Sequence, residues 1–359
     1  MIGFSQFLSL ILIFVILVSL TSFLVLYFTG YFNTITSAYN SNVGDVISSC
    51  MKIESAKNNK IYLKNCGSGV IKKDKLNIMI DNDLFNFSMN KDNVEKSEIA
   101  EITIKDSWKL SLGNHKIAIF SPGGKVERYV KASLPDSAVL ILDFDEGSGN
   151  YTYDKSPYGN NGTLYSGASI CSNPPILGCP KWTQGKSGSA LEFDGSNDFV
   201  SVSHDKSINI TGGYTIELWV KRNVKTGYQY FVQKEENCNG YGIAIDDSLR
   251  AFIYFGNGTD CGGFWLRTTS SYTPSTDQFY HLMGTHTSGE QKIYVNGNQV
   301  SIVSGGNYVG NPLSTSTPLN IGRHATSGFY FNGTIDSVRI YNKALTPDGI
   351  ISFTLGELT

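Results

Sequence analysis

The segment Ala190–Val202, ALEFDGSNDFVSV, contains the side chains best suited to chemistry. Glu192 and Asp194 are spaced as the first two acids of a Glu-x-Asp-x-x-Glu motif, with which retaining glycosidases supply a nucleophile and an acid/base. That chemistry requires two carboxyl groups about 5–5.5 Å apart. Asn197 occupies the last position of the motif, and an amide can neither donate nor accept the catalytic proton. We therefore predict that this segment is not catalytic and that the protein is not an enzyme.

The same residues are also typical of two strands joined by a turn. Leu191 and Phe193 lie on one face of an extended chain and Glu192 lies on the other. Asp194 and Gly195 then begin a turn, which interrupts the strand that would have to align a catalytic set. We expect a structural turn here.

The composition favours an all-β fold. Charged residues make up 17% of the 359-residue chain, aromatic residues make up 12%, and there are 37 glycines. Apolar and polar residues alternate in TIELWV and KIYVNG, which predicts strands, and NGN and DDSLR are typical of hairpin turns. In residues 137–349 the one helix signal is the short TPDGI segment. We expect antiparallel sheets packed face to face.

The cysteines indicate an oxidising environment. The six cysteines fall into local pairs without CxxC spacing, which is typical of disulfides outside the cytoplasm and disfavours a zinc ribbon. We expect the bridges Cys50–Cys66, Cys171–Cys179 and Cys238–Cys261.

Residues 1–45 form a hydrophobic segment. Within it, Phe7–Phe28 has only Ser and Thr as polar members, and no charged residue precedes Asp45. A helix over these 22 residues would be about 33 Å long, enough to cross the hydrocarbon core of a bilayer. The segment lacks the basic start and the short apolar core of a cleaved signal. We expect an uncleaved helix that lies in a membrane or packs against copies of itself in a filament.

Residues 46–135 are predicted to form a small immunoglobulin-like β-sandwich. Strand-like runs such as KIYLKN and HKIAIF alternate apolar and polar residues, and the turn signals AKNN, IDND, SLGN and SPGG separate such runs. An apolar N-terminal helix followed by a β domain resembles archaeal type IV pilin-like proteins, archaellins included. The run SLGNHKIAIFSPGG resembles the end of the β domain of archaellin-like proteins. This resemblance implies a subunit of an extracellular filament.

Residues 136–359 are expected to form a second β domain. The segment VLILDFDEGSGNYTYDKSPYGNNGTLYSGA is followed by GKSGSALEFDGSNDFVSV, GGYTIELWVKRN, KIYVNGNQV, LNIGRH and FNGTIDSVRIYNKALTPDGI. These runs, in this order, resemble the successive landmarks of laminin-G-like domains of the concanavalin A-like lectin/glucanase type. The resemblance implies a jelly-roll sandwich of two antiparallel sheets.

The laminin-G-like resemblance also implies a calcium ion at the sandwich edge. Asp336, in GTIDSVRIY, matches a ligand in the last strand, and Gly195 lies where a carbonyl ligand would come from. Further candidates are Asp194, Asn197 and Asp143. Calcium favours about 6–8 oxygen ligands, so carbonyls and waters would have to complete the site. In the alternative interpretation, Asp336 only accepts hydrogen bonds from backbone amides.

Aromatic residues on loops are the candidates for ligand binding, because sugars stack on flat rings. Trp265 follows Cys261 and Tyr241 follows Cys238, so a bridge between these cysteines would bring both rings to one rim. Ordinary packing within a sheet is the alternative. Six Asn-x-Ser/Thr sequons make glycosylation feasible, at Asn86, Asn150, Asn161, Asn209, Asn257 and Asn332.

These observations predict a membrane-anchored surface protein with extracellular β domains. Its laminin-G-like domain is expected to bind a cell-surface glycan or protein in adhesion. The first alternative is a pilin- or archaellin-like subunit of an extracellular filament, and the second is a glycoside hydrolase. The N-terminal helix would contact the membrane or other copies of the chain, and we expect no nucleic-acid partner.

Overall fold

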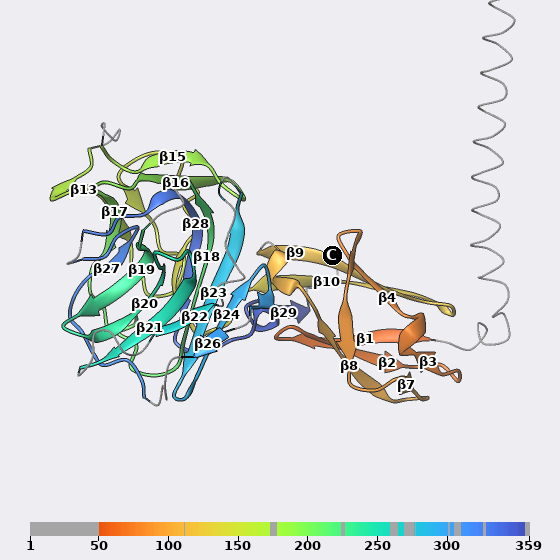
Figure 1. Cartoon of the computed structure of the whole chain (residues 1–359). Coiled ribbons are helices and arrows are strands. Elements are labelled where there is room, and N and C mark those ends of the chain that lie inside the picture. Colours follow the sequence, from red (N-terminus) through yellow and green to blue (C-terminus); the bar gives the residue numbers. More distant parts are fainter. Residues whose placement is uncertain are drawn as a thin grey trace, which may run out of the picture. The chain divides into compact units, whose positions relative to one another are not determined.

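The computed structural model describes residues 50–355 apart from residues 111, 173–177, 224–226, 259–264, 269–275, 277, 301, 305–309 and 326–327. This part of the chain consists of β-strands and of 3-10 helices three residues long (Figure 1). The 3-10 helices are η1 (Lys73–Lys75), η2 (Ser107–Lys109) and η3 (Pro347–Gly349). The described residues contain no helix of the length and hydropathy that a membrane crossing requires.

The predicted fold class therefore needs a correction. Its β-sandwich part is confirmed, whereas the hydrophobic helix that it included has no counterpart among the described elements, all of which are strands, turns or short 3-10 helices. Residues 1–45, on which that helix was predicted, lie outside the described residues.

The described chain forms two compact units. The first contains the residues up to Lys105, the segment Asn114–Lys131 and the residues from Thr354 onward. The second contains Asp106–Gly113 and Ala132–Phe353. The chain therefore passes from the first unit to the second twice and returns to the first each time.

The first unit is a small sandwich of short antiparallel strands. One sheet has the order β1 (Met51–Lys57), β2 (Lys60–Asn65), β8 (Ile99–Ile104), β6 (Phe87–Met89). The other has the order β29 (Ser352–Leu355), β10 (Gly124–Ser133), β9 (Gly113–Ser121), β4 (Asn77–Ile80), β5 (Asp83–Phe85). A further pair joins β3 (Ile71–Lys72) to β7 (Asn93–Val94).

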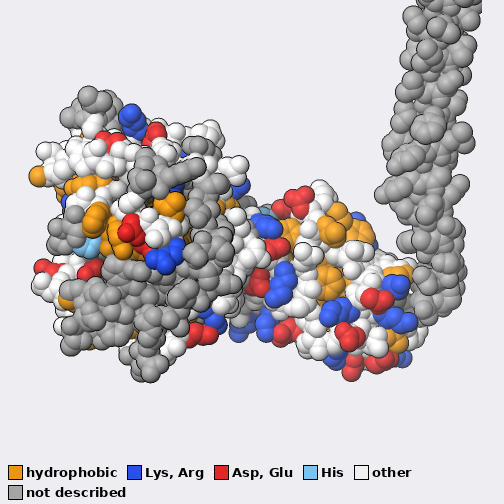
Figure 2. All heavy atoms as spheres, viewed as in Figure 1, with side chains coloured by type: hydrophobic (Ala, Val, Ile, Leu, Met, Phe, Trp, Pro, Cys, Tyr) orange, Lys and Arg blue, Asp and Glu red, His pale blue; other side chains and the backbone are white. Residues whose placement is uncertain are grey.

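Alternation explains the core of the first unit. In β2, Ile61 and Leu63 are buried while the lysines beside them are not, as the run KIYLKN predicts. Basic and acidic side chains are interspersed over the visible face of this unit (Figure 2), and several form ion pairs, such as Lys60 with Glu101 at 2.6 Å.

The second unit consists of two larger sheets. The eight-stranded sheet has the order β15 (Lys181–Gln184), β16 (Ser189–Asp194), β28 (Asn332–Tyr341), β18 (Tyr214–Arg222), β23 (Tyr280–Thr287), β24 (Glu290–Val295), β25 (Asn298–Gln299), and β11 (Ala138–Leu142) also pairs with β28. The ten-stranded sheet has the order β12 (Tyr151–Thr152), β13 (Gly162–Ser166), β17 (Asp198–Val202), β27 (Leu319–Ile321), β19 (Gln229–Glu236), β20 (Asn239–Ile245), β21 (Ala251–Asn257), β22 (Trp265–Thr268), β26 (Ile302–Ser304), and β14 (Ser169–Ile170) also pairs with β13.

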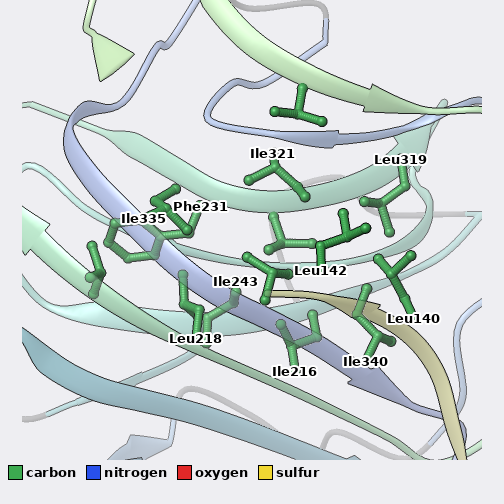
Figure 3. Packing of buried hydrophobic residues seen from close by; sticks show 14 of the residues in the cluster. Leu140, Leu142, Ile216, Leu218, Phe231, Ile243, Leu319, Ile321, Ile335 and Ile340 are labelled. Carbon is green, nitrogen blue, oxygen red and sulfur yellow. The ribbon is translucent and has the colours of Figure 1, made fainter. Parts of the chain in front are cut away.

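The core of the second unit lies between the two sheets. Ile216 and Leu218 of β18 pack with Ile335 of β28 from one sheet and with Phe231 and Ile243 from the other (Figure 3). All five side chains are fully buried. Burying an aliphatic or aromatic side chain of this size stabilises the fold by roughly 1.5–3 kcal/mol, so this layer holds the sheets together.

A β-bulge decides which residues of β19 face outward. The pairing of β19 with β20 shifts register between Tyr230 and Val232. The bulge lets the consecutive residues Phe231 and Val232 both enter the core, while Tyr230 joins a separate cluster of rings. The ten-stranded sheet thus presents aromatic side chains on its outer face, the face directed away from the core.

Candidate ligand-binding face

Asp336, the leading calcium candidate, is a fully buried residue of β28. Its Oδ2 accepts the backbone N–H groups of Lys186 at 2.9 Å and Ser187 at 3.2 Å. Its Oδ1 accepts the hydroxyl of Ser337 at 3.2 Å. Burial, together with the charge of Asp145, raises the pKa of Asp336 to about 6. Because protein donors contact both oxygens, the geometry favours the hydrogen-bonding interpretation of Asp336 over a calcium ligand.

Asp143 is engaged by basic side chains. Lys155 Nζ lies 3.1 Å from its Oδ2, and Arg339 Nη2 lies 3.4 Å from its Oδ1. These two cations already neutralise the carboxylate. The residues around Asp143 and Asp336 therefore do not fit a calcium ion well.

Asp194, Gly195 and Asn197 form the predicted turn between β16 and β17. Asp194 Oδ1 accepts the N–H of Ser196 at 2.7 Å, and Gly195 adopts a φ of +81° that favours glycine. Asn197 donates its amide to a neighbouring hydroxyl at 3.0 Å. The turn is structural, as expected.

The turn cannot share an ion with Asp336. Asp194 pairs with Asn332, which is four positions from Asp336 along β28, or about 13 Å at 3.3 Å per residue. Among the described residues, no group of three or more His, Cys, Asp or Glu side chains could hold a metal ion. The described residues neither support nor exclude a bound calcium ion, and thermal unfolding with and without calcium decides between the two interpretations of Asp336.

The two aromatic residues singled out from the sequence have different positions. Tyr241 is 1% exposed, donates its hydroxyl to the carbonyl of Ile208 at 2.7 Å, and belongs to the core. The prediction that Tyr241 reaches a rim is wrong, because the alternation of β20 directs it inward. Trp265 pairs with Tyr254 across β21 and β22, but its side chain lies outside the described residues.

Two predicted disulfides are confirmed, Cys50–Cys66 and Cys171–Cys179. Cys238 is also in a disulfide, while its predicted partner Cys261 lies outside the described residues.

The asparagines of the six sequons differ in whether the side-chain nitrogen Nδ2, to which a glycan would be attached, donates a hydrogen bond within the fold. Asn150, Asn209 and Asn332 donate Nδ2 to oxygen acceptors within the fold at 2.8, 2.7 and 2.9 Å. Asn86 and Asn161 are exposed, and the side chain of Asn257 lies outside the described residues.

An aromatic face, which we define as Tyr228, Tyr230, Phe252, Tyr254 and Phe329, covers part of the outer side of the ten-stranded sheet. The ring centroids of Tyr230 and Phe252 are 6.1 Å apart, and those of Tyr230 and Tyr254 are also 6.1 Å apart, both in edge-on contact. Phe329 lies 5.8 Å from Tyr228 and is 41% exposed. The buried rings thus form a base for partly exposed ones.

A glycine makes room for this arrangement. Gly242 of β20 pairs with Tyr254 of β21, and a Cβ on Gly242 would lie 2.5 Å from the Tyr254 hydroxyl oxygen. Any side chain there would displace the ring. The packing of the aromatic face therefore depends on glycine at this position.

Polar groups border the aromatic face. His324 lies 4.5 Å from Tyr230, ring to ring, and its Nε2 lies 3.8 Å from Glu235 Oε2. Burial raises the pKa of Glu235, against hydrogen bonds from Tyr254 and Gln233, and burial lowers the pKa of His324. Both shifts favour the uncharged forms. The border therefore offers hydrogen-bonding groups of low charge beside flat rings.

Sequence reasoning missed this face, although a signal for it exists. In AFIYF, Ala251, Ile253 and Phe255 belong to the core, while Phe252 and Tyr254 point to the opposite side. A strand that is apolar on both faces indicates that its outer face is covered or binds something.

Comparison with known proteins agrees with this architecture. Residues 194–351 match a family model described as the concanavalin A-like lectin/glucanases superfamily. This match supports a concanavalin A-like jelly-roll domain over that range. The laminin-G-like prediction is confirmed over that range, and the resemblance of the N-terminal part to archaellins stays a prediction. None of the curated proteins matches the chain.

Several solved structures resemble the chain in fold. Domain 4 of AbnA, a GH43 extracellular arabinanase from Geobacillus stearothermophilus in complex with arabinotriose, is 20% identical with a TM-score of 0.46, over 60% of this chain and 96% of that one. The binding domain of Paraclostridial Mosquitocidal Protein 1 is 18% identical with a TM-score of 0.45, over 60% and 51%. A structure on the ganglioside-dependent cell entry of botulinum neurotoxin type C is 16% identical with a TM-score of 0.40, over 59% and 49%. The chain thus spans about half of each toxin structure.

Proposed function

We propose that the aromatic face of the concanavalin A-like domain binds a glycan and that the protein acts in adhesion outside the cell. The observation that carries this proposal is the cluster of Tyr228, Tyr230, Phe252 and Tyr254, which packs on the outer face of the ten-stranded sheet, apart from the core. Phe329 extends the cluster towards solvent. Tyr230, Phe252 and Tyr254 are 5% exposed or less, so Tyr228 and Phe329 are the rings of this face that solvent reaches.

The chemistry of the face suits a sugar. Sugar rings have apolar C–H faces that stack on flat aromatic rings, and their hydroxyls need nearby donors and acceptors. The exposed ring of Phe329 and the partly exposed ring of Tyr228 supply the stacking surface. Glu235 and His324, which are both partly exposed, supply hydrogen-bonding groups beside it. The matched family, which is named for lectins and glucanases, supports this proposal.

We infer binding without catalysis at this face. Glycoside hydrolysis uses two carboxyl groups on opposite sides of the scissile bond. Within the aromatic face and its polar border, as far as the structure describes them, Glu235 is the one carboxyl group. A single acid can orient a hydroxyl, but it cannot complete the pair.

We infer an extracellular location from the disulfides. The bonds Cys50–Cys66 and Cys171–Cys179 occur one in each compact unit. Such bonds persist in oxidising compartments and are rare where cellular thiols stay reduced.

A glycan array tests the proposal. We expect the purified protein to bind a subset of immobilised glycans. The variants Phe329→Ala and Tyr228→Ala should each lose about fivefold in affinity, since a stacked ring contributes on the order of 1 kcal/mol. Tyr153→Ala is the matched control, because Tyr153 is 59% exposed and lies beside β12, at the far edge of the same sheet. If no glycan binds, or if all three variants bind alike, the proposal fails.

A further inference from the structure

An arginine stacks on one ring of an aromatic pair beside the aromatic face. The Cζ atom of Arg323 lies 3.4 Å from the ring centroid of Phe199. The Phe199 ring in turn stacks on Tyr165, with centroids 4.9 Å apart and planes inclined by 7°. We name these three residues the arginine stack.

Neighbouring strands build this stack. Tyr165 of β13 and Phe199 of β17 are direct cross-strand partners. Leu164 and Val200, which also pair with each other, point into the core. Alternation therefore directs Tyr165 and Phe199 to the outer face. Arg323 follows β27, the next strand of the sheet, and so reaches Phe199.

Hydrogen bonds fix the orientation of the guanidinium. Its Nε donates to Asn320 Oδ1 at 3.1 Å, and the side chain also bonds to Tyr330. Arg323 and Tyr330 are linked by a β-bridge as well. The fork of the arginine is therefore held in place rather than free to rotate in solvent.

Arg323 forms no ion pair with any carboxylate among the described residues. Other arginines of the unit contrast with it: Arg250 lies 2.8 Å from Asp246, and Arg339 lies 3.4 Å from both Asp143 and Glu217. A partly buried, oriented guanidinium without an anionic partner in the described chain indicates that the partner comes with a ligand.

The arginine stack adjoins the aromatic face. Strand β27 lies between β17 and β19, and His324, the residue after Arg323, contacts Tyr230 of β19. From β13 to β21 the order of the sheet gives five inter-strand spacings, or about 24 Å at 4.8 Å each. A glycan chain that crosses these strands would meet the aromatic rings and Arg323 together.

We propose that Arg323 binds the carboxylate of an acidic sugar, so that the ligand is a glycan carrying uronate or sialate groups. This inference rests on the proposed glycan-binding function and names the class of glycan. A planar guanidinium matches a carboxylate in a two-point contact. Two of its five N–H groups are used by Asn320 and Tyr330, and stacking on Phe199 occupies a face of the group, so the remaining N–H groups at the edge are left for the anion. The low-charge border of Glu235 and His324 would then contact neutral hydroxyls.

The test uses the intact protein and two probes, an oligogalacturonate and its uncharged methyl ester. An array of acidic and neutral glycans is measured beside them. We expect wild type to prefer carboxylated glycans and Arg323→Gln to lose about 10- to 100-fold in affinity for them, while its weaker binding of neutral glycans persists. Arg323→Lys keeps the charge without the fork and should recover only part of the loss. Lys206→Gln removes the same charge from an exposed site and is the control.

The outcomes separate the two proposals. If wild type binds no glycan at all, the proposed function fails and this inference fails with it. If wild type binds neutral and acidic glycans equally, or if Arg323→Gln binds acidic glycans as wild type does, the function stands and the role of Arg323 is refuted. Raised salt should weaken wild-type binding of acidic glycans and leave the residual binding of Arg323→Gln unchanged.

Discussion

The burial of His286 should make the second unit unstable in mild acid. His286 lies on β23, is fully buried, and has the rings of Phe255 and Tyr214 at 4.4 and 5.1 Å. Its Nε2 lies 3.1 Å from the carbonyl oxygen of Gly310, and its Nδ1 lies 3.1 Å from Gln291 Nε2. These partners suit the neutral ring, with Nε2 donating and Nδ1 accepting. A second proton, added at Nδ1, would point at the N–H group of Gln291 Nε2, so the charged ring would lose this hydrogen bond.

The size and the sign of the effect follow from the pKa of His286. Burial lowers this pKa from 6.5 to about 4. The unfolded chain therefore takes up a proton below pH 6.5, whereas the folded protein does so only near pH 4. The stabilisation is complete above pH 6.5 and is lost as the pH falls towards 4. A difference of about 2.5 pKa units amounts to roughly 3 kcal/mol.

Thermal unfolding between pH 7.5 and pH 4 measures this loss. For a unit of this size, roughly 3 kcal/mol corresponds to a fall in Tm of about 6–12 °C. His286→Phe should be less stable at pH 7.5, because it lacks the two hydrogen bonds, but its Tm should fall less between pH 6.5 and pH 4. His204→Gln, at an exposed histidine, should keep the wild-type slope. Equal slopes in wild type and His286→Phe would refute the reasoning.

Three further predictions concern polar and covalent links of the second unit. Glu217→Ala leaves the partly buried Arg339 guanidinium without one of its anionic partners and should lower the free energy of unfolding by about 3–5 kcal/mol in urea titrations. A loss below about 1 kcal/mol would contradict this. Asp336→Ala removes the acceptor of two backbone N–H groups and should lower the free energy of unfolding by about 2–4 kcal/mol. We expect calcium and a chelator to leave the wild-type Tm unchanged. A calcium-dependent rise in Tm that Asp336→Ala abolishes would instead establish a metal site. Replacing both Cys171 and Cys179, which are 8 residues apart, by Ser should cost about 2–3 kcal/mol; an unchanged Tm would show that the bridge does not stabilise the fold.

Much of the second unit could be predicted from local pattern. The alternation of TIELWV places Ile216 and Leu218 in the core, as observed. The Asp-Gly pair at residues 194–195 predicts a turn, and that turn joins β16 to β17. Such features depend on neighbours in the chain, so a single sequence contains them.

The candidate site depends on partners distant in sequence. Tyr230 faces outward because of a bulge that only the pairing of β19 with β20 reveals. Arg323 meets Phe199 because β27 inserts between β17 and β19 in the sheet. Tyr241 enters the core because it alternates with Ile243 and Ile245 along β20, and its nearness to Cys238 in the sequence does not bring it to a rim. Strand order and bulges are set by tertiary packing, which periodicity alone does not show.

The return of the chain to the first unit has a practical consequence for dissecting the protein. Strand β29 is the edge of the five-stranded sheet and covers β10, so a fragment cut at residue 135 would carry β10 with its hydrogen-bonding edge unpaired. An open edge of this kind pairs readily with another copy of itself. Such a fragment would be expected to dimerise or aggregate, and that behaviour would be an artefact of the cut. A fragment of the first unit that is to report on native behaviour must therefore carry Ser352–Leu355 fused after β10, with the second unit replaced by a short linker.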